Sequence, residues 1–381
     1  PPAKELRPVH TTIAPASPSA AAMPRPAPRV APATTATRPR SARPSGLQSI
    51  ARVSRENRCV YPASAFSGIL ARVTPLQRYI AEEIATDHVD GLMSRREALR
   101  RLALLGVGTA AATALIAACG ENKKPTSEAP ATSTGAVTSS ESASASAPPP
   151  GSDKTLPTEP ITWSGPQGEL QGAWAEAPNA RGGVLVIHEN KGLNDWVRSV
   201  AGRFAGIGYS ALAIDLLSAQ GGTAKFSDPA QATAALGNIP NDQFVANLKS
   251  GVGELQRRVP DKKVAAVGFC MGGGLVWQML AASTPELAAA VPFYGPAPEN
   301  PDFAGSKNAA VLAFYGALDD RVTKTEPVVR AALEKAGLVH DLVTEPDANH
   351  AFFNDTGDRY NAAAAADAWR RVQDWFGKYV V

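Results

Sequence analysis

The sequence predicts an α/β domain with a mostly parallel, doubly wound sheet in residues 156–381, preceded by an N-terminal region with no comparable core. Three observations lead to this fold class. Short runs that are apolar almost throughout recur in residues 156–381, as in strands covered on both faces. Stretches of helical length and pattern separate these runs, which favours parallel pairing. The preceding residues are instead rich in Pro, Ala, Ser, Thr and Arg.

The elements of the domain follow from local patterns. In residues 161–177, apolar and polar residues alternate around the turn sequence Pro166-Gln167-Gly168, which predicts an antiparallel hairpin at one edge of the sheet. The apolar runs predict strands at 182–188, 210–216, 263–269, 287–295, 309–316 and 340–345. Helices are predicted at 195–208, 242–258, 273–283 and 324–337. Functional side chains are expected at the carboxyl ends of the strands.

Residues 1–92 are interpreted as disordered or as an N-terminal extension. Residues 1–72 carry eleven Lys/Arg against two acids, but they lack the aromatic interleaving and the fold signature of a nucleic-acid binder. We therefore expect no nucleic-acid partner. Because the stretch that begins at Val73 resembles a more natural precursor start, our hypothesis is that residues 1–72 are translated upstream sequence absent from the native precursor.

Residues 93–119 have the order of a bacterial export signal. Arginines, among them the pair Arg95-Arg96, precede an apolar run over 102–118, which favours the twin-arginine route. The sequence IAAC at 116–119 resembles a lipobox, so Cys119 is the predicted lipidation site and membrane anchor of a cell-envelope lipoprotein. An uncleaved membrane helix and soluble export are the alternatives. The low-complexity residues 120–155 are predicted to be a flexible linker.

Residues 156–381 contain one cysteine, Cys270, which lies between a predicted strand and a predicted helix. The sequence Gly268-Phe269-Cys270-Met271-Gly272 has the G-x-C-x-G form of a nucleophile elbow, a strained turn in which neighbouring Cβ atoms would collide with the chain. At a helix N-terminus the thiol pKa is expected to be lowered. A buried structural cysteine is the alternative. A Walker-type phosphate loop is disfavoured because no Lys follows the glycines.

The candidate base is His350, which follows the last predicted strand. Between Cys270 and His350, the run ending at 316 is followed by Asp319 and Asp320, of which Asp319 is the preferred carboxylate partner for the imidazole and Asp320 the alternative. The order nucleophile, acid, histidine is known in one large class of enzymes. Glu189 ends another strand at the same rim, where it is either functional or a solvent-exposed acid. The neighbouring His188 is interpreted as structural.

Residues 180–381 resemble the dienelactone hydrolase family of the α/β-hydrolase superfamily. The resemblance rests on VIHENKGLNDWVRSVAGRFAGIGYSALAIDLLS, VGFCMGGGL, VPFYG, AFYGALDDRVT and ANHAFF, in family order. It implies that Cys270 is the nucleophile, His350 the base, Asp319 its orienting acid and Glu189 a carboxylate that interacts with the resting thiol. It also implies an oxyanion hole formed by the backbone N–H groups of Met271 and Asn190, and a reaction that needs no metal or cofactor.

The expected activity is hydrolysis of a small-molecule ester or lactone, or of a thioester, through an acyl-enzyme. Family members that act on dienelactones clamp the substrate carboxylate with arginines. Here residues 222–246 offer only Lys225 as a cation, and Asn354 stands four residues after His350, so a neutral substrate is at least as well supported. A non-catalytic ligand-binding lipoprotein with the same fold is the alternative. A redox thiol protein is disfavoured, because residues 156–381 hold no second cysteine.

Overall fold

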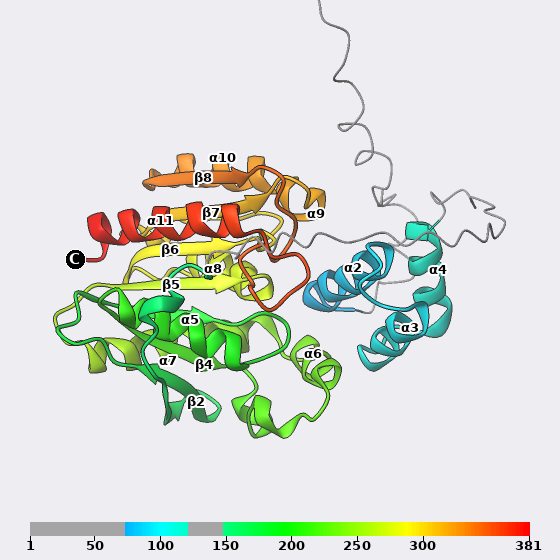
Figure 1. Cartoon of the computed structure of the whole chain (residues 1–381), viewed down its shortest axis with the longest axis horizontal. Coiled ribbons are helices and arrows are strands. Elements are labelled where there is room, and N and C mark those ends of the chain that lie inside the picture. Colours follow the sequence, from blue (N-terminus) through cyan, green and yellow to red (C-terminus); the bar gives the residue numbers. More distant parts are fainter. Residues whose placement is uncertain (1–72, 121–147) are drawn as a thin grey trace, which may run out of the picture. The chain divides into compact units, whose positions relative to one another are not determined.

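The central feature of the computed structural model is one eight-stranded sheet with strand order β1-β2-β4-β3-β5-β6-β7-β8 (Figure 1). The structure describes residues 73–120 and 148–381. The strands are β1 (Glu159–Gly165), β2 (Gly168–Ala175), β3 (Gly182–Ile187), β4 (Tyr209–Asp215), β5 (Val264–Phe269), β6 (Leu287–Phe293), β7 (Ala310–Gly316) and β8 (His340–Glu345). Strands β1 and β2 form the predicted antiparallel edge hairpin, β2 is antiparallel to β4, and the other pairs are parallel. The predicted fold class is confirmed.

Helices cover both faces of this sheet (Figure 1). They are α5 (Asp195–Gly206), α6 (Pro229–Gly237), α7 (Asn241–Arg258), α8 (Met271–Ala281), α9 (Asp320–Thr323), α10 (Glu326–Ala336) and α11 (Ala362–Tyr379). Two neighbouring glycines in β3 distinguish the faces, because successive Cβ positions of a strand point to opposite sides. A Cβ on Gly182 would meet Val380, directly after α11, whereas one on Gly183 would meet Leu255 of α7.

Four predicted helices correspond to α5, α7, α8 and α10, whereas α6, α9 and α11 were not predicted. Helix α6 is alanine-rich with little contrast between apolar and polar faces, and α9 has only four residues. Helix α11 has a clear apolar face, so it could have been predicted from the sequence. Four short 3₁₀ turns complete the domain: Ser152–Lys154, Ser218–Gln220, Thr223–Lys225 and Ala304–Ser306.

The core beneath the carboxyl ends of the strands contains a stack of aromatic rings. Phe269, Phe293 and Phe314 occupy paired positions on β5, β6 and β7. Their ring centroids are 4.9 Å and 4.6 Å apart, and all three side chains are buried. The backbone N–H of Cys270 donates to the carbonyl of Phe293 at 3.1 Å. The residue that follows β5 is therefore fixed by the core of the sheet.

Three further helices lie before the hydrolase-like part of the sequence: α2 (Pro75–Val89), α3 (Arg95–Leu104) and α4 (Thr109–Gly120). They belong to the same structural unit as the sheet, residues 54–381. Helix α2 begins with Pro75 and a capping box between Thr74 and Gln77. Residues 73–92, assigned above to the N-terminal extension, thus contain a capped helix. The boundary predictions for residues 1–72 and most of the linker fall outside the described residues.

The apolar run 102–118 of the predicted export signal is divided between two helices. Helix α3 ends at Leu104, Gly106 has a φ of 84°, and α4 begins at Thr109. Within the described segments, we find no helix that combines the length and the apolar character needed to cross a bilayer. The predicted lipidation residue Cys119 lies in the last turn of α4.

Candidate active site

Cys270 lies in a sharp turn between β5 and α8. Its backbone has φ 55° and ψ −117°, a conformation that is strained for a residue with a side chain. A Cβ on Gly268 would lie 2.1 Å from the carbonyl oxygen of Gly272, and one on Gly272 would lie 2.4 Å from that of Ile187. Both flanking positions therefore require glycine. The strand, turn and helix expected of a nucleophile elbow are all present.

The acid and the imidazole of the predicted triad are directly bonded. Nδ1 of His350 lies 2.6 Å from Oδ2 of Asp319, and both side chains are buried. Burial by itself raises the pKa of Asp319, but the charge and hydrogen bond of His350 outweigh it, so the pKa is lowered. Oδ1 accepts from the backbone N–H of Val322, which fixes the carboxylate at the start of α9. The alternative acid, Asp320, is exposed.

The sulfur of Cys270 lies near the same imidazole. A ring nitrogen of His350 is within 4.8 Å of Sγ, although 80 residues of sequence separate the two side chains. The hydroxyl of Tyr79, on α2, lies 3.5 Å from Sγ and 3.4 Å from Nε2 of His350. Sulfur, imidazole and carboxylate therefore meet at the carboxyl edge of the sheet as predicted, and a hydroxyl from an unpredicted helix contacts both sulfur and imidazole.

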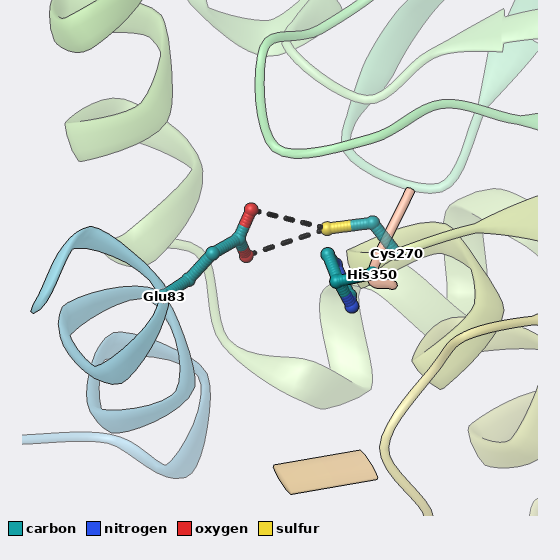
Figure 2. Close-up of side chains that lie close together, drawn as sticks. All are labelled: Glu83, Cys270 and His350. Carbon is teal, nitrogen blue, oxygen red and sulfur yellow. Dashed lines mark hydrogen bonds between the residues drawn. The ribbon is translucent and has the colours of Figure 1, made fainter. Parts of the chain in front are cut away.

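The carboxylate bonded to the sulfur is Glu83 of α2. The Cys270 thiol donates to its two oxygens at 3.4 Å and 3.6 Å, and Figure 2 shows this carboxylate directed at the sulfur beside His350. Glu189, expected from the family resemblance to interact with the thiol, is buried nearby. Its Oε2 accepts from Nδ2 of Asn354 at 2.9 Å, and its Oε1 accepts from the Tyr294 hydroxyl at 3.4 Å. The predicted role of Glu189 stays a prediction.

The electrostatics at Cys270 differ from the expectation of a lowered pKa. Burial raises the thiol pKa well above its usual value, and the negative charges of Glu83 and Glu189 raise it further. The hydrogen bond from Tyr79 and the charge of Arg321 act in the opposite direction but do not compensate. The helix N-terminus is present, yet burial of the sulfur, together with the two carboxylates, outweighs it. In this arrangement Cys270 is a neutral thiol at pH 7.

The two predicted oxyanion-hole residues lie on adjacent turns. Met271 is the first residue of α8, where backbone N–H groups lack helical partners. Asn190 follows β3, and its carbonyl accepts from the Thr233 hydroxyl at 2.8 Å. The close approach of Gly272 to the end of β3 brings these turns together. Their proposed action on an oxyanion remains an inference from the resemblance.

His188 has a structural environment, as predicted. Nδ1–H donates to the carbonyl of Glu189 at 2.6 Å, and Nε2 accepts from the backbone N–H of Leu216 at 3.2 Å. These bonds define one neutral tautomer. Burial lowers the pKa of this imidazole, which keeps it uncharged. His188 thus ties the end of β3 to the end of β4.

One group of side chains in the described segments has donors suited to a metal ion. It consists of Glu83, Cys270 and His350, whose donor atoms lie within 4.8 Å of one another. Carboxylate, thiolate and imidazole are ligands that zinc accepts. Two of the three are the candidate nucleophile and base, so a bound metal would compete with the chemistry expected of them. We therefore assign no metal or cofactor to the site.

A cavity of about 260 Å³ adjoins the candidate site. Its lining combines Glu189, Asn190 and His350 with residues of α2 and α3. Arg359 also lines it, but its guanidinium is bonded to Asp87 of α2 at 2.7 Å. The two positions considered above for substrate binding place no cation in this cavity. Lys225 is exposed on a 3₁₀ turn and does not line the cavity, and Asn354 is a neutral side chain bonded to Glu189.

Three residues of this site were not predicted from the sequence: Tyr79, Glu83 and Arg321. The guanidinium carbon of Arg321 lies 4.4 Å from the centre of the Tyr79 ring, and its Nη1 donates to the Tyr79 carbonyl at 3.3 Å. Tyr79 and Glu83 are four residues apart, which on a helix places them on one face. That spacing alone does not distinguish an active-site face from any other polar helix surface.

Comparison with known proteins agrees with this geometry. The model of the Dienelactone hydrolase family matches residues 170–380. A candidate carboxymethylenebutenolidase from Escherichia coli O157:H7 is 33% identical over 229 residues, which cover 56% of this chain and 84% of that protein. A counterpart from Methylorubrum extorquens is 32% identical over 211 residues, covering 52% of this chain and 72% of that protein.

Among solved structures, a candidate dienelactone hydrolase from Klebsiella pneumoniae is 31% identical with a TM-score of 0.51. The match covers 58% of this chain and 99% of that one. The family match covers most of β2, strands β3 to β8, the elbow and the Asp319–His350 pair, whereas β1 and helices α2 to α4 precede it. The chain belongs to the dienelactone hydrolase family, and its enzyme activity is that of an ester or lactone hydrolase.

Proposed function

We propose that the chain hydrolyses its substrate through an acyl-enzyme formed on Cys270, with His350 as the base and Asp319 as the acid that orients it. The observation that carries this proposal is the bonded Asp319–His350 pair beside a cysteine in a nucleophile elbow. Asp319 holds Nδ1 of the imidazole, which leaves Nε2 to accept the thiol proton. The imidazole of His350 lies between the carboxylate of Asp319 and the sulfur of Cys270, and this division of roles requires that arrangement.

The reaction has two halves. The thiol proton of Cys270 passes to Nε2 of His350 while sulfur attacks the carbonyl carbon, and the carbonyl oxygen becomes an oxyanion. In this proposal the N–H groups of Met271 and Asn190 stabilise this charge, and each such donor can lower the barrier by about 3–4 kcal/mol. The C–O bond of the ester then breaks, and the leaving alkoxide takes the proton from His350.

Water completes the second half. His350 accepts a proton from water as the hydroxide oxygen attacks the thioester carbon, and the tetrahedral intermediate expels the sulfur of Cys270. The proton on His350 returns to sulfur, which restores the thiol and releases a carboxylic acid. Since neither of the two positions considered above carries an arginine, we propose an uncharged ester, lactone or thioester as the substrate.

The test is a comparison of Cys270→Ala with the wild-type chain on p-nitrophenyl esters and on a panel of lactones and thioesters. We expect kcat/KM to fall at least about 10³-fold in the variant. An acyl-enzyme adduct on Cys270, detected by mass spectrometry of quenched reactions, should be absent from it. Turnover that survives the substitution would instead favour a ligand-binding protein that has kept the fold.

We further propose that the protein is exported, by the twin-arginine route, and attached to the cell envelope through a lipid on Cys119. The support is the sequence order of Arg95-Arg96, the apolar run 102–118 and IAAC. Replacement of Cys119 by Ser should abolish incorporation of labelled fatty acid and move the protein out of the detergent phase. Equal labelling of this variant would refute the lipid site.

A further inference from the structure

One face of helix α2 contacts the active site at three successive helical turns. Tyr79, Glu83 and Asp87 follow each other at intervals of four residues, which aligns them along the helix. The Tyr79 hydroxyl contacts Sγ of Cys270 and Nε2 of the imidazole, and the Glu83 carboxylate accepts the thiol hydrogen. Asp87 binds Arg359 at the rim of the cavity. The family match covers residues 170–380 and does not include this helix.

We propose that the mouth of the active site is a docking surface for the chain's own helix α2, which holds Cys270 as an unreactive thiol and covers His350. This inference rests on the proposed role of Cys270 as nucleophile. It assigns Tyr79 and Glu83 as positioning residues that act on the resting state, not on the reacting substrate. Ester hydrolysis by the full chain is therefore limited to the fraction of molecules in which α2 has undocked.

The chemistry of the contacts is that of a blocked nucleophile. Glu83 accepts the thiol hydrogen, so proton loss would leave a thiolate facing a carboxylate. The negative charges of Glu83 and Glu189 both raise the pKa of Cys270, and Arg321 is the cation that partly offsets them. Tyr79, in addition, lies where Nε2 would receive the thiol proton. A carbonyl compound cannot reach sulfur and imidazole together while this hydroxyl occupies the position.

The attachment of α2 combines a buried face with polar contacts at its two ends. Five residues of the helix are buried and belong to the same hydrophobic cluster as the core of the sheet. Arg359 binds Asp87 at 2.7 Å and Asp90 at 2.6 Å at the end of the helix. At the other end, Nε2 of Gln77 donates to Oδ1 of Asn238 at 3.0 Å. Undocking of α2 therefore requires both the release of these polar contacts and the exposure of its buried face.

The position of α2 in the sequence suggests how it would be removed. The helix precedes Cys119, and cleavage before Cys119 would separate α2, α3 and most of α4 from the sheet. The proposal thus includes cleavage of the chain before Cys119 when the lipid is attached, and departure of the released helices would uncover Cys270. The uncleaved chain would then be a proenzyme whose thiol is protected until it reaches the envelope.

The experiment measures alkylation of Cys270 by iodoacetamide in the full chain, quantified by mass spectrometry of its peptide. Glu83→Gln keeps the size of the side chain and removes the charge, so we expect alkylation at pH 7.5 to accelerate at least about tenfold, as for a pKa lowered by one unit. Arg359→Gln, which frees the end of α2, should also accelerate it by improving access. The wild-type rate should lie below that of a free thiol.

Glu82→Gln is the matched control, since it removes one charge from the neighbouring position of the same helix. Its alkylation rate should stay within twofold of the wild type, with equal melting temperatures across the set. Wild-type rates in both Glu83→Gln and Arg359→Gln would overturn the inference while leaving the triad untouched. Faster alkylation of these variants combined with full ester turnover in Cys270→Ala would overturn the proposed catalytic role instead.

Discussion

The two parts of the molecule that meet at Cys270 are held together by different forces. The sheet carries the cysteine on a turn fixed by buried aromatic rings, and the strands on either side of β5 are almost wholly buried. Helix α2 reaches the same sulfur through polar side chains, and ion pairs fasten its end. Covered strands must move with the whole domain. Helix α2 is held by polar contacts and by five buried residues, so its departure would leave the strands in place but expose that buried face. The first part can supply a rigid site and the second a removable cover.

The largest effect is expected for Asp319→Asn, a change confined to the sheet region. The amide cannot stabilise an imidazolium and favours the wrong tautomer of His350, so kcat should fall roughly 10³–10⁴-fold. Because the fold is unaffected, the melting temperature should change little. Steady-state kinetics and differential scanning calorimetry check both expectations.

Asp320→Asn is the control for this prediction, since Asp320 is the adjacent, exposed carboxylate. Its kcat should remain close to that of the wild type. Equal losses in the two variants would mean that the assignment of the orienting acid is wrong.

The sequence predicts the strands and three residues of the candidate site, but not the contacts of α2. The strands could be predicted because buried parallel strands are apolar throughout, and Cys270, Asp319 and His350 could be predicted because each follows a strand whose end lies at one edge. Glu83 could not be predicted, because 187 residues separate it from the cysteine it contacts. Residues 95–118 also carry the pattern of an export signal, which gives no indication that the preceding helix packs on an active site.

The direction of the Cys270 pKa illustrates the same limit. A helix N-terminus is a local feature, visible in the Gly-rich sequence after β5, and it predicts a lowered thiol pKa. Burial of the sulfur, the largest cause, and the carboxylates of Glu83 and Glu189 act only in the folded chain, and together they raise the pKa. The local sequence therefore gives the wrong direction for the thiol pKa of the folded chain.

A smaller effect is expected when a buried side chain is truncated in each of the two parts. The two truncations should change different quantities. Phe293→Ala removes the central ring of the stack between Phe269 and Phe314, so it should lower the free energy of unfolding by about 3–5 kcal/mol. Leu102→Ala removes a buried side chain of α3. It should loosen the N-terminal helices and accelerate alkylation of Cys270 without lowering the stability of the sheet.

Urea titration followed by tryptophan fluorescence measures the first change, and limited proteolysis within residues 73–120 measures the second. If Leu102→Ala lowers the midpoint of the sheet as much as Phe293→Ala does, the helices and the sheet unfold as one cooperative unit. The idea of a separately removable cover would then lose its basis.

The smallest expected effect concerns pH: the sheet should lose stability as pH rises, and the N-terminal helices should lose stability as pH falls. Burial and the nearby charge of Asp367 raise the pKa of Glu345, at the end of β8, to about 7. A carboxyl whose folded pKa is raised contributes stability that is fully present below its unfolded value and is lost as pH rises through 7. Hydrogen bonds from Arg100 and Arg101 lower the pKa of Glu97, on α3, to about 2. Its contribution is present above the unfolded value and is lost as pH falls toward 2.

The sheet should therefore lose some stability between about pH 4.5 and pH 7, and Glu345→Gln should remove that loss because a neutral amide has no charged form to disfavour. Helix α3 should instead begin to loosen below about pH 4, and the contribution of Glu97 is lost near pH 2, where this carboxylate takes up its proton in the folded chain. Melting temperatures at pH 5 and 8 test the first expectation, and proteolysis of residues 73–120 at pH 2 to 5 by an acid-active protease tests the second. Both parts losing stability in the same pH range would show that one network of charges holds them, and α2 could then not be released while the sheet remains folded.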